Sequence, residues 1–219
     1  MMDKISESDV MIPCSGGVQL DGCLSVPERA RGLVLFVHGS GSSRFSVRNR
    51  HVAHILNEAC LATLLFDLFT TEEDAIDSQT RALRFDIAFL AARLEDATRW
   101  CLTRPDLKDL AIGYFGASTG GGAALMAAAS ESHIKAVVSR GGRPDLAMEH
   151  LPKVTAPTLL IVGGDDGPVI DMNRAALAKM HCMAELKIVP GATHLFEEPG
   201  KLDQVALFAK EWFGRYLTE

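Results

Sequence analysis

The sequence predicts an α/β protein with a mostly parallel central sheet and helices on both of its faces. Short, uninterrupted apolar runs recur along the 219 residues, and stretches with helical spacing separate them. Runs of this kind are typical of strands buried on both faces, as in parallel sheets. Their alternation with helices indicates right-handed βαβ crossovers. Functional residues are therefore expected at the carboxyl ends of the strands.

The expected elements follow in chain order. Two β-rich stretches, 10–12 and 18–26, come first. Apolar runs too short for helices predict buried strands at 33–37, 62–66, 111–115, 136–138, 158–162 and 186–189. Helices are predicted at 47–60, 81–102, 120–130, 172–182 and 201–216. The polar stretch 70–77 follows a strand end and is interpreted as a mobile rim.

Composition predicts a single domain spanning residues 1–219, because no repeat or linker divides the chain. The net charge of -6 argues against nucleic acid or an anionic membrane surface as partner. No apolar run is long enough for a transmembrane helix, and the polar N-terminus lacks the pattern of a signal peptide. Five scattered cysteines without a CxxC pair favour a cytoplasmic location. No metal site or cofactor is expected.

The clearest chemical signal is a G-x-S-x-G motif at residues 116–120, with Ser118 at its centre. It lies between the predicted strand 111–115 and the small-residue helix 120–130, the strand–turn–helix context that a nucleophile elbow requires. The flanking glycines leave room for the sharp turn, and the helix start directs free N–H groups at developing negative charge. Ser118 is therefore predicted to be a nucleophile. A phosphate-binding turn is disfavoured, because neither common glycine-rich phosphate motif occurs there.

A serine hydroxyl needs a base to accept its proton and an acid to orient that base. Asp165 and Asp166 follow strand 158–162, and His194 follows strand 186–189. Ser, Asp and His thus come in the chain order expected around a nucleophile elbow, each just past a buried strand. His194 is the predicted base, and either aspartate could orient it. A turn cap and a structural histidine are the alternatives for each partner taken alone.

An oxyanion hole is expected where strand 33–37 runs into His38-Gly39-Ser40-Gly41. Glycine beside this turn lets a backbone N–H approach a substrate oxygen. The predicted donors are the N–H groups of Ser40, with Gly41 as the fallback, and of Thr119. A plain strand-to-helix turn is the alternative.

These segments resemble the α/β-hydrolase superfamily and, within it, the dienelactone-hydrolase-like branch. The resemblance covers nearly the whole chain and implies the α/β-hydrolase fold. The family commonly writes its acid loop as G-x-x-D followed by x-x-V, which implies Asp166, three residues before Val169, as the triad acid. Dienelactone hydrolases proper carry cysteine where this chain has Ser118, so the resemblance implies the fold and not the substrate. Residues 115–158 leave no room for a lid domain, which implies an open site.

Two arginines are candidates for substrate binding. Arg140 follows strand 136–138 on the expected rim of the site, and Arg44 follows the oxyanion turn. Guanidinium groups facing the pocket would favour a carboxylate or phosphate on the substrate. The alternative is that both arginines cap helices or pair with surface acids.

The leading hypothesis is a serine hydrolase of carboxylesterase type that cleaves a small carboxylic ester through an acyl-enzyme on Ser118. Its expected partner is a small-molecule ester. A thioesterase or small-amide hydrolase would use the same three residues. A non-catalytic, ligand-binding descendant of the fold is the alternative of a different class, although such a module has no chemical need for all three.

Overall fold

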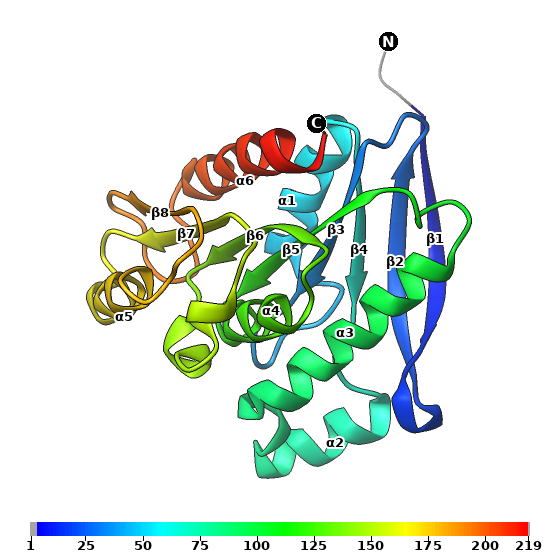
Figure 1. Cartoon of the computed structure of the whole chain (residues 1–219). Helices are drawn as coiled ribbons and strands as arrows, with labels where there is room; N and C mark the ends of the chain where they lie inside the picture. The colour runs from blue at the N-terminus through cyan, green and yellow to red at the C-terminus, as the bar shows by residue number, and fades with distance from the viewer. Residues whose placement is uncertain (1–3, 219) are drawn as a thin grey trace.

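A computed structural model describes residues 4–218 and contains one eight-stranded sheet. The strand order is β1-β2-β4-β3-β5-β6-β7-β8 (Figure 1). The strands are β1 (Ile5–Pro13), β2 (Gln19–Pro27), β3 (Gly32–Val37), β4 (Leu61–Phe66), β5 (Ala111–Ala117), β6 (Ile134–Arg140), β7 (Thr158–Gly163) and β8 (Ala184–Val189). Strands β3 to β8 are parallel, whereas β1 and β2 add an antiparallel edge. The predicted mostly parallel sheet is confirmed.

Helices cover both faces of this sheet, as predicted. They are α1 (Val47–Glu58), α2 (Thr71–Thr80), α3 (Ile87–Thr103), α4 (Thr119–Ser130), α5 (Gly167–Leu177) and α6 (Lys201–Leu217). Helices α1 and α6 lie on one face, and α3, α4 and α5 lie on the other (Figure 1). Successive residues of β3 enter opposite cores: Leu33 and Leu35 pack towards α3 and α4, whereas Val34 and Phe36 pack towards α1 and α6. This two-sided burial explains why the strand is an unbroken apolar run.

The order of the strands reverses at β3, which places two functional loops side by side. The chain leaves β3 to form β4 on one side and later returns as β5 on the other. Val37, the last residue of β3, pairs in register with Gly116 of β5. A cleft is expected at such a switch point, outside the carboxyl ends of the strands. The turn after β3 and the turn holding Ser118 therefore meet at the same edge of the sheet.

Two sequence-based predictions about helices were wrong. The helix predicted at 172–182 instead spans Gly167–Leu177. It begins earlier than predicted because Pro168 is tolerated in the first turn of a helix, where its missing N–H costs no hydrogen bond. The polar stretch 70–77, interpreted as a mobile rim, lies largely within α2. Thr70 and Glu73 form a reciprocal capping box at its start. The T-x-x-E spacing was the available signal for this helix start.

Helix α3 begins later than the predicted position 81. Asp86 caps it by accepting a 3.0 Å hydrogen bond from the N–H of Phe89. A short 3-10 turn, Leu83–Phe85, precedes this cap and connects it to α2. Residues 67–86, between β4 and α3, thus form α2 and a short 3-10 turn rather than the start of one long helix, and this segment is called the strap below.

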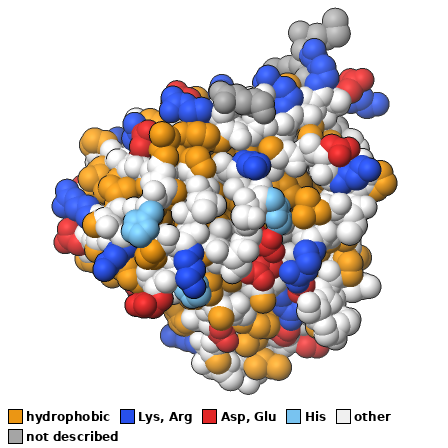
Figure 2. All heavy atoms as spheres, in the orientation of Figure 1, with side chains coloured by type: hydrophobic (Ala, Val, Ile, Leu, Met, Phe, Trp, Pro, Cys, Tyr) orange, Lys and Arg blue, Asp and Glu red, His pale blue; other side chains and the backbone are white. Residues whose placement is uncertain are grey.

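The surface shows mixed charges. Lys and Arg side chains are interspersed with Asp and Glu on the face drawn in Figure 2, with hydrophobic side chains between them. None of the helices formed by residues 4–218 is long and apolar enough to cross a membrane.

Candidate active site

Ser118 lies on a strained turn between β5 and α4. Its φ of 52° and ψ of -122° are unusual for a residue with a Cβ atom. The chain passes so close to itself here that glycine is required on both sides. A Cβ on Gly116 would lie 2.5 Å from the carbonyl oxygen of Gly120, and a Cβ on Gly120 would lie 2.6 Å from that of His38. The turn therefore has the geometry of a nucleophile elbow.

The three side chains expected to act together form a continuous hydrogen-bonded row. His194 Nε2 lies 3.3 Å from Ser118 Oγ, and His194 Nδ1 lies 2.6 Å from Asp166 Oδ2. This spacing assigns the Nδ1 proton to the bond with the carboxylate and leaves Nε2 to accept the serine proton. Residues separated by up to 76 positions in sequence thus meet at the carboxyl edge of the sheet.

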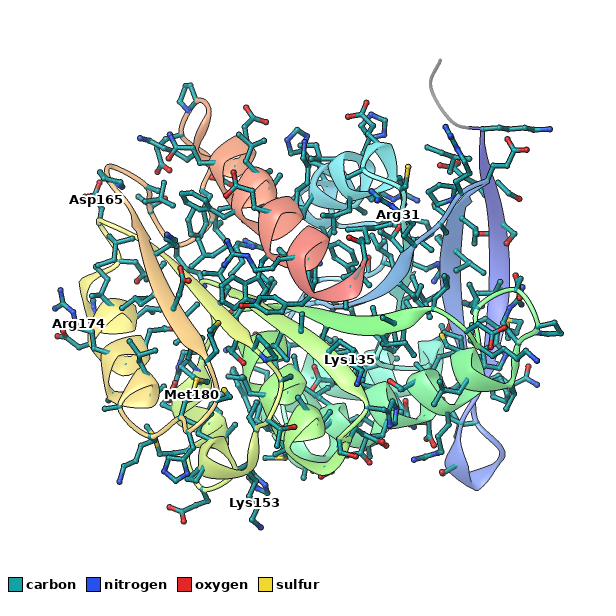
Figure 3. The ribbon with its side chains drawn as sticks, turned by 45° about the horizontal axis from the view of Figure 1, so that its top comes forward. Arg31, Lys135, Lys153, Asp165, Arg174 and Met180 are labelled. Atoms are coloured by element: carbon teal, nitrogen blue, oxygen red, sulfur yellow. The ribbon has the colours of Figure 1, made fainter. Side chains whose placement is uncertain are left out.

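The two neighbouring aspartates, Asp165 and Asp166, have different surroundings in the structure. Asp166 occupies the N-cap position of α5, but its side chain makes no capping hydrogen bond and turns to His194 instead. The Asp166 side chain is 14% exposed. Asp165 is exposed and lies at the margin of the molecule (Figure 3). Its backbone N–H donates to the carbonyl of Ala192, which ties the acid loop to the histidine loop.

The histidine ring also lies against the segment that follows β6. A Cβ on Gly141 would lie 3.2 Å from the carbonyl oxygen of His194 and 3.4 Å from its Nδ1, so this segment lies close to the histidine. The backbone N–H of Ser118 donates to the carbonyl of Arg140, and the N–H of Arg143 donates to the carbonyl of Ser118. The loops after β5, β6, β7 and β8 are therefore packed against one another around the row.

The turn after β3 contacts the elbow directly. The N–H of Ser40 donates a 3.0 Å hydrogen bond to the hydroxyl oxygen of Thr119, and a Cβ on Gly39 would lie 3.1 Å from Ser118 Cβ. Gly41, the fallback donor, has a φ of 71° that favours glycine. The sequence analysis did not foresee the Thr119 hydroxyl as the partner of Ser40. An oxyanion role for Ser40 and Thr119 stays a prediction.

The side chain of His38 links the turn after β3 to the chain that follows β4. The side chain is buried; Nδ1 donates to the carbonyl of Gly39 at 2.9 Å, and Nε2 accepts from the N–H of Leu68 at 3.2 Å. Burial lowers the pKa of His38 below its ordinary 6.5, although the hydrogen bond to Gly39 and the nearby Asp67 oppose this shift. The sequence analysis quoted His38 only as part of the turn. Its place at the end of a buried strand was the available signal.

The neutral state of His38 predicts a loss of stability in acid. Below pH 6.5 the unfolded chain binds a proton that the folded chain excludes, so the free energy of unfolding falls as pH drops towards the lower pKa of the folded state. Between pH 6.5 and 5.5 this single group can remove at most about 1.4 kcal/mol. Urea unfolding of the wild type and of His38→Gln at both pH values measures the difference. An equal pH dependence in the two proteins would contradict the prediction.

The two arginines expected at the substrate are already engaged or buried. The guanidinium of Arg44 pairs with Asp67, and its Nη1 lies 3.5 Å from Asp21. Arg140 is only 6% exposed and donates to the side-chain oxygen of Asn49 in α1 at 3.2 Å. Burial, with a smaller contribution from Arg48, lowers the pKa of Arg140 to about 10. Substrate contact by either arginine stays a prediction that this geometry does not favour.

A groove of about 930 Å³ lies beside the turn after β3. One wall is the turn itself, from Gly41 to Ser46, and the other is the strap that follows β4. His38, Phe69 and Arg84 line both this groove and a narrow crevice, too tight for a water molecule, that also touches Gly39, Ser40 and Thr119. The groove therefore lies beside the turn whose Gly39 and Ser40 contact Ser118 and Thr119. Arg84 could not be predicted from the sequence, because nothing in the local pattern distinguishes it from a surface arginine.

The sheet, the elbow and the hydrogen-bonded row define an α/β-hydrolase fold. The sequence profile of the dienelactone hydrolase family matches residues 41–216, and the chain belongs to that family. The structure of a dienelactone hydrolase from Anabaena variabilis is 58% identical, with a TM-score of 0.95 over 97% of this chain and 99% of that chain. Est1E from Butyrivibrio proteoclasticus is 18% identical, with a TM-score of 0.79 over 94% and 98% of the two chains, and shares the fold.

Two Mycobacterium tuberculosis proteins, from strains CDC 1551 and H37Rv, are 58% identical over 200 residues. They carry a provisional phosphoribosyl transferase name. The match covers 91% of this chain but only 44% of those proteins, so this chain spans less than half of their length.

Proposed function

We propose that this chain is a serine hydrolase that cleaves small carboxylic esters through an acyl-enzyme. The observation that carries the proposal is the row of Ser118, His194 and Asp166 on a strained elbow, with distances of 3.3 and 2.6 Å between successive partners. A packing turn needs neither the positive φ of Ser118 nor a histidine directed at its hydroxyl.

In the proposed acylation step, Ser118 Oγ attacks the ester carbonyl carbon while its proton passes to His194 Nε2. Asp166 holds the imidazole with Nε2 facing the serine and stabilises the imidazolium that forms. The carbonyl oxygen becomes an oxyanion. When the intermediate collapses, the bond to the alcohol oxygen breaks and His194 returns the proton to the leaving alcohol.

The proposed donors to the oxyanion are the backbone N–H groups of Ser40 and Thr119. The Ser40 N–H already points at the elbow, where it donates to the Thr119 hydroxyl. Rotation of the Thr119 side chain about χ1 moves this oxygen away and frees the N–H for the substrate oxygen. Water, activated by His194, then attacks the acyl-enzyme by the same route and releases the acid.

Membership of the dienelactone hydrolase family supports a hydrolase, and Ser118 in place of cysteine suits ordinary esters. The same row would serve a thioester or a small amide, so rates on matched oxygen ester, thioester and amide substrates decide among them. The open rim supports a small substrate, because only two short 3-10 turns, Pro144–Ala147 and Leu151–Lys153, lie between β6 and β7. The transferase name of the M. tuberculosis relatives is not carried over, because most of their length lies outside the match.

Labelling with a fluorophosphonate probe tests the proposal directly. Purified wild type is expected to react at one site, which mass spectrometry locates in the peptide carrying Ser118, and Ser118→Ala is expected to remain unlabelled. The probe reports an activated serine, since a hydroxyl without a base reacts poorly. Absence of labelling in a folded wild type would favour the ligand-binding descendant.

A further inference from the structure

We propose that the groove beside the turn after β3 binds a neutral, oxygen-rich part of the substrate, with Arg84 as the hydrogen-bond donor that recognises it. This inference rests on the proposed ester hydrolysis and specifies its substrate class. The groove has the volume for a group of this kind, and it adjoins the turn that contacts the elbow, since Gly41 lines the groove and the N–H of Ser40 bonds to Thr119.

Arg84 is held in position by a buried carboxylate. The Asp77 side chain is 1% exposed; its Oδ2 accepts from Arg84 Nε at 2.6 Å, and its Oδ1 accepts from the backbone N–H groups of Leu83 and Arg84 at 2.9 and 3.0 Å. Burial alone would raise the pKa of Asp77, but the bonds from Arg84 and Leu83 hold it below its ordinary value. Asp77 therefore stays charged and fixes the guanidinium.

The free end of this guanidinium faces the oxyanion turn. Arg84 Nη2 donates to the carbonyl oxygen of Asp77 at 3.3 Å, whereas Nη1 lies 3.9 Å from the position that a Cβ of Gly41 would occupy. Within residues 4–218, Asp77 is the only acid paired with Arg84. Nη1 thus presents a donor to the groove beside the turn after β3, and the bonds to Asp77 hold it there without a ligand.

The charges around the groove favour a neutral ligand over an anion. Arg44 and Arg84 are both paired with aspartates, so neither presents a free positive charge to an anion. Four carboxylates against two guanidinium groups leave the described lining with an excess of negative charge. Glu72 and Asp74 are exposed at the rim, where water and salt screen them, so a cation gains little from them.

The remaining lining is rich in groups that match hydroxyls. Serine and threonine side chains both donate and accept hydrogen bonds, as a polyol does. The hydroxyl side chains of the groove are Ser42, Ser43, Ser46, Thr70, Thr71 and Ser78. Phe45 and Phe69 add apolar surface against which carbon atoms of such a group can pack. A hydroxylated ester is the substrate class that satisfies both features.

Matched esters test this proposal. Two pairs of esters are to be compared. In 1-glyceryl butyrate and propyl butyrate the hydroxyls differ on the alcohol side, and in methyl 2,3-dihydroxypropanoate and methyl propanoate they differ on the acyl side. The wild type is expected to hydrolyse the hydroxylated member of one pair with about tenfold higher kcat/KM, the size of one hydrogen bond. Arg84→Met is expected to abolish this preference through KM and to leave the plain ester within twofold of wild type.

The control variant is Arg104→Met, which removes another arginine paired to an aspartate, Asp106, outside the groove. It is expected to keep the preference. If Arg84→Met lowers kcat/KM equally for the hydroxylated and the plain ester of each pair, the inference is overturned. Arg84 would then act only by stabilising the turn after β3. The butyrate ester of glycolate carries a negative charge. If the wild type hydrolyses it faster than the neutral hydroxylated esters, the assignment of a neutral substrate class is overturned. If no ester at all is hydrolysed, the proposed function itself fails, which is a different outcome from hydrolysis without preference.

Discussion

Replacing Ser118 by alanine is expected to lower kcat/KM for a small ester by about 10⁵-fold. The substitution removes the only atom that forms the covalent bond, and the row of His194 and Asp166 then has no hydroxyl to activate. A residual rate above that in water is expected from the oxyanion donors and from binding. Steady-state kinetics with an activated ester, corrected for the uncatalysed reaction, measures the loss.

Stability should change little in this variant, because alanine meets the same backbone strain at φ 52° as serine does. Ser130→Ala, an exposed serine at the end of the same helix, is the matched control and is expected to keep full activity. Wild-type turnover in Ser118→Ala would remove the triad assignment altogether. His194→Ala should fall to a similar residual rate, because the two residues act as a unit.

Asp166→Asn is expected to lower kcat/KM by about 10³- to 10⁴-fold, whereas Asp165→Asn should stay within threefold of wild type. An amide at position 166 can donate to His194 Nδ1, which moves the ring proton to Nε2 and leaves no acceptor for the Ser118 proton. The exposed side chain of Asp165 has no such role, and its backbone bond to Ala192 survives the substitution.

The pair of variants is compared at one pH and on one ester, because each removes one negative charge from adjacent positions and keeps the shape of the side chain. A general electrostatic effect of the acid loop would lower both rates alike. The reverse ranking would move the orienting acid to Asp165 and would require the loop to rearrange on substrate binding.

Much of the fold and the centre of the site could be predicted, because both depend on local patterns. A strand buried on two faces must be an unbroken apolar run, and Ser118 stands directly after such a run, β5. The prediction of a buried strand at 186–189 was wrong, because β8 is the edge strand of the sheet and its Lys187 and Ile188 are exposed. The start of α5 was misplaced by five residues, because apolar spacing carries little information in a first turn that contains Pro168. Helix α2 was missed for a similar reason: its charged, exposed residues show no apolar face, and only its capping box marks it.

The sequence pattern alone could not decide whether Asp165 or Asp166 orients His194. Both aspartates follow the same strand, and resemblance to a family, not spacing, favoured Asp166. In the structure the choice follows from the start of α5, which places Asp166 at the N-cap facing His194 and leaves Asp165 exposed. A shift of one residue in a loop reverses the direction of a side chain, and only the packed helix determines it.

The alternation of strands and helices, the nucleophile elbow and the order of Ser118 and His194 along the chain can all be inferred from the residues without a structure. The partners of the arginines depend on the folded arrangement: Arg44 pairs with an aspartate 23 residues away, and Arg140 bonds to Asn49, 91 residues away. The physical reason is one of range. Backbone conformation depends on neighbours in the chain, whereas the partner of a long charged side chain depends on which distant segments the sheet order brings together.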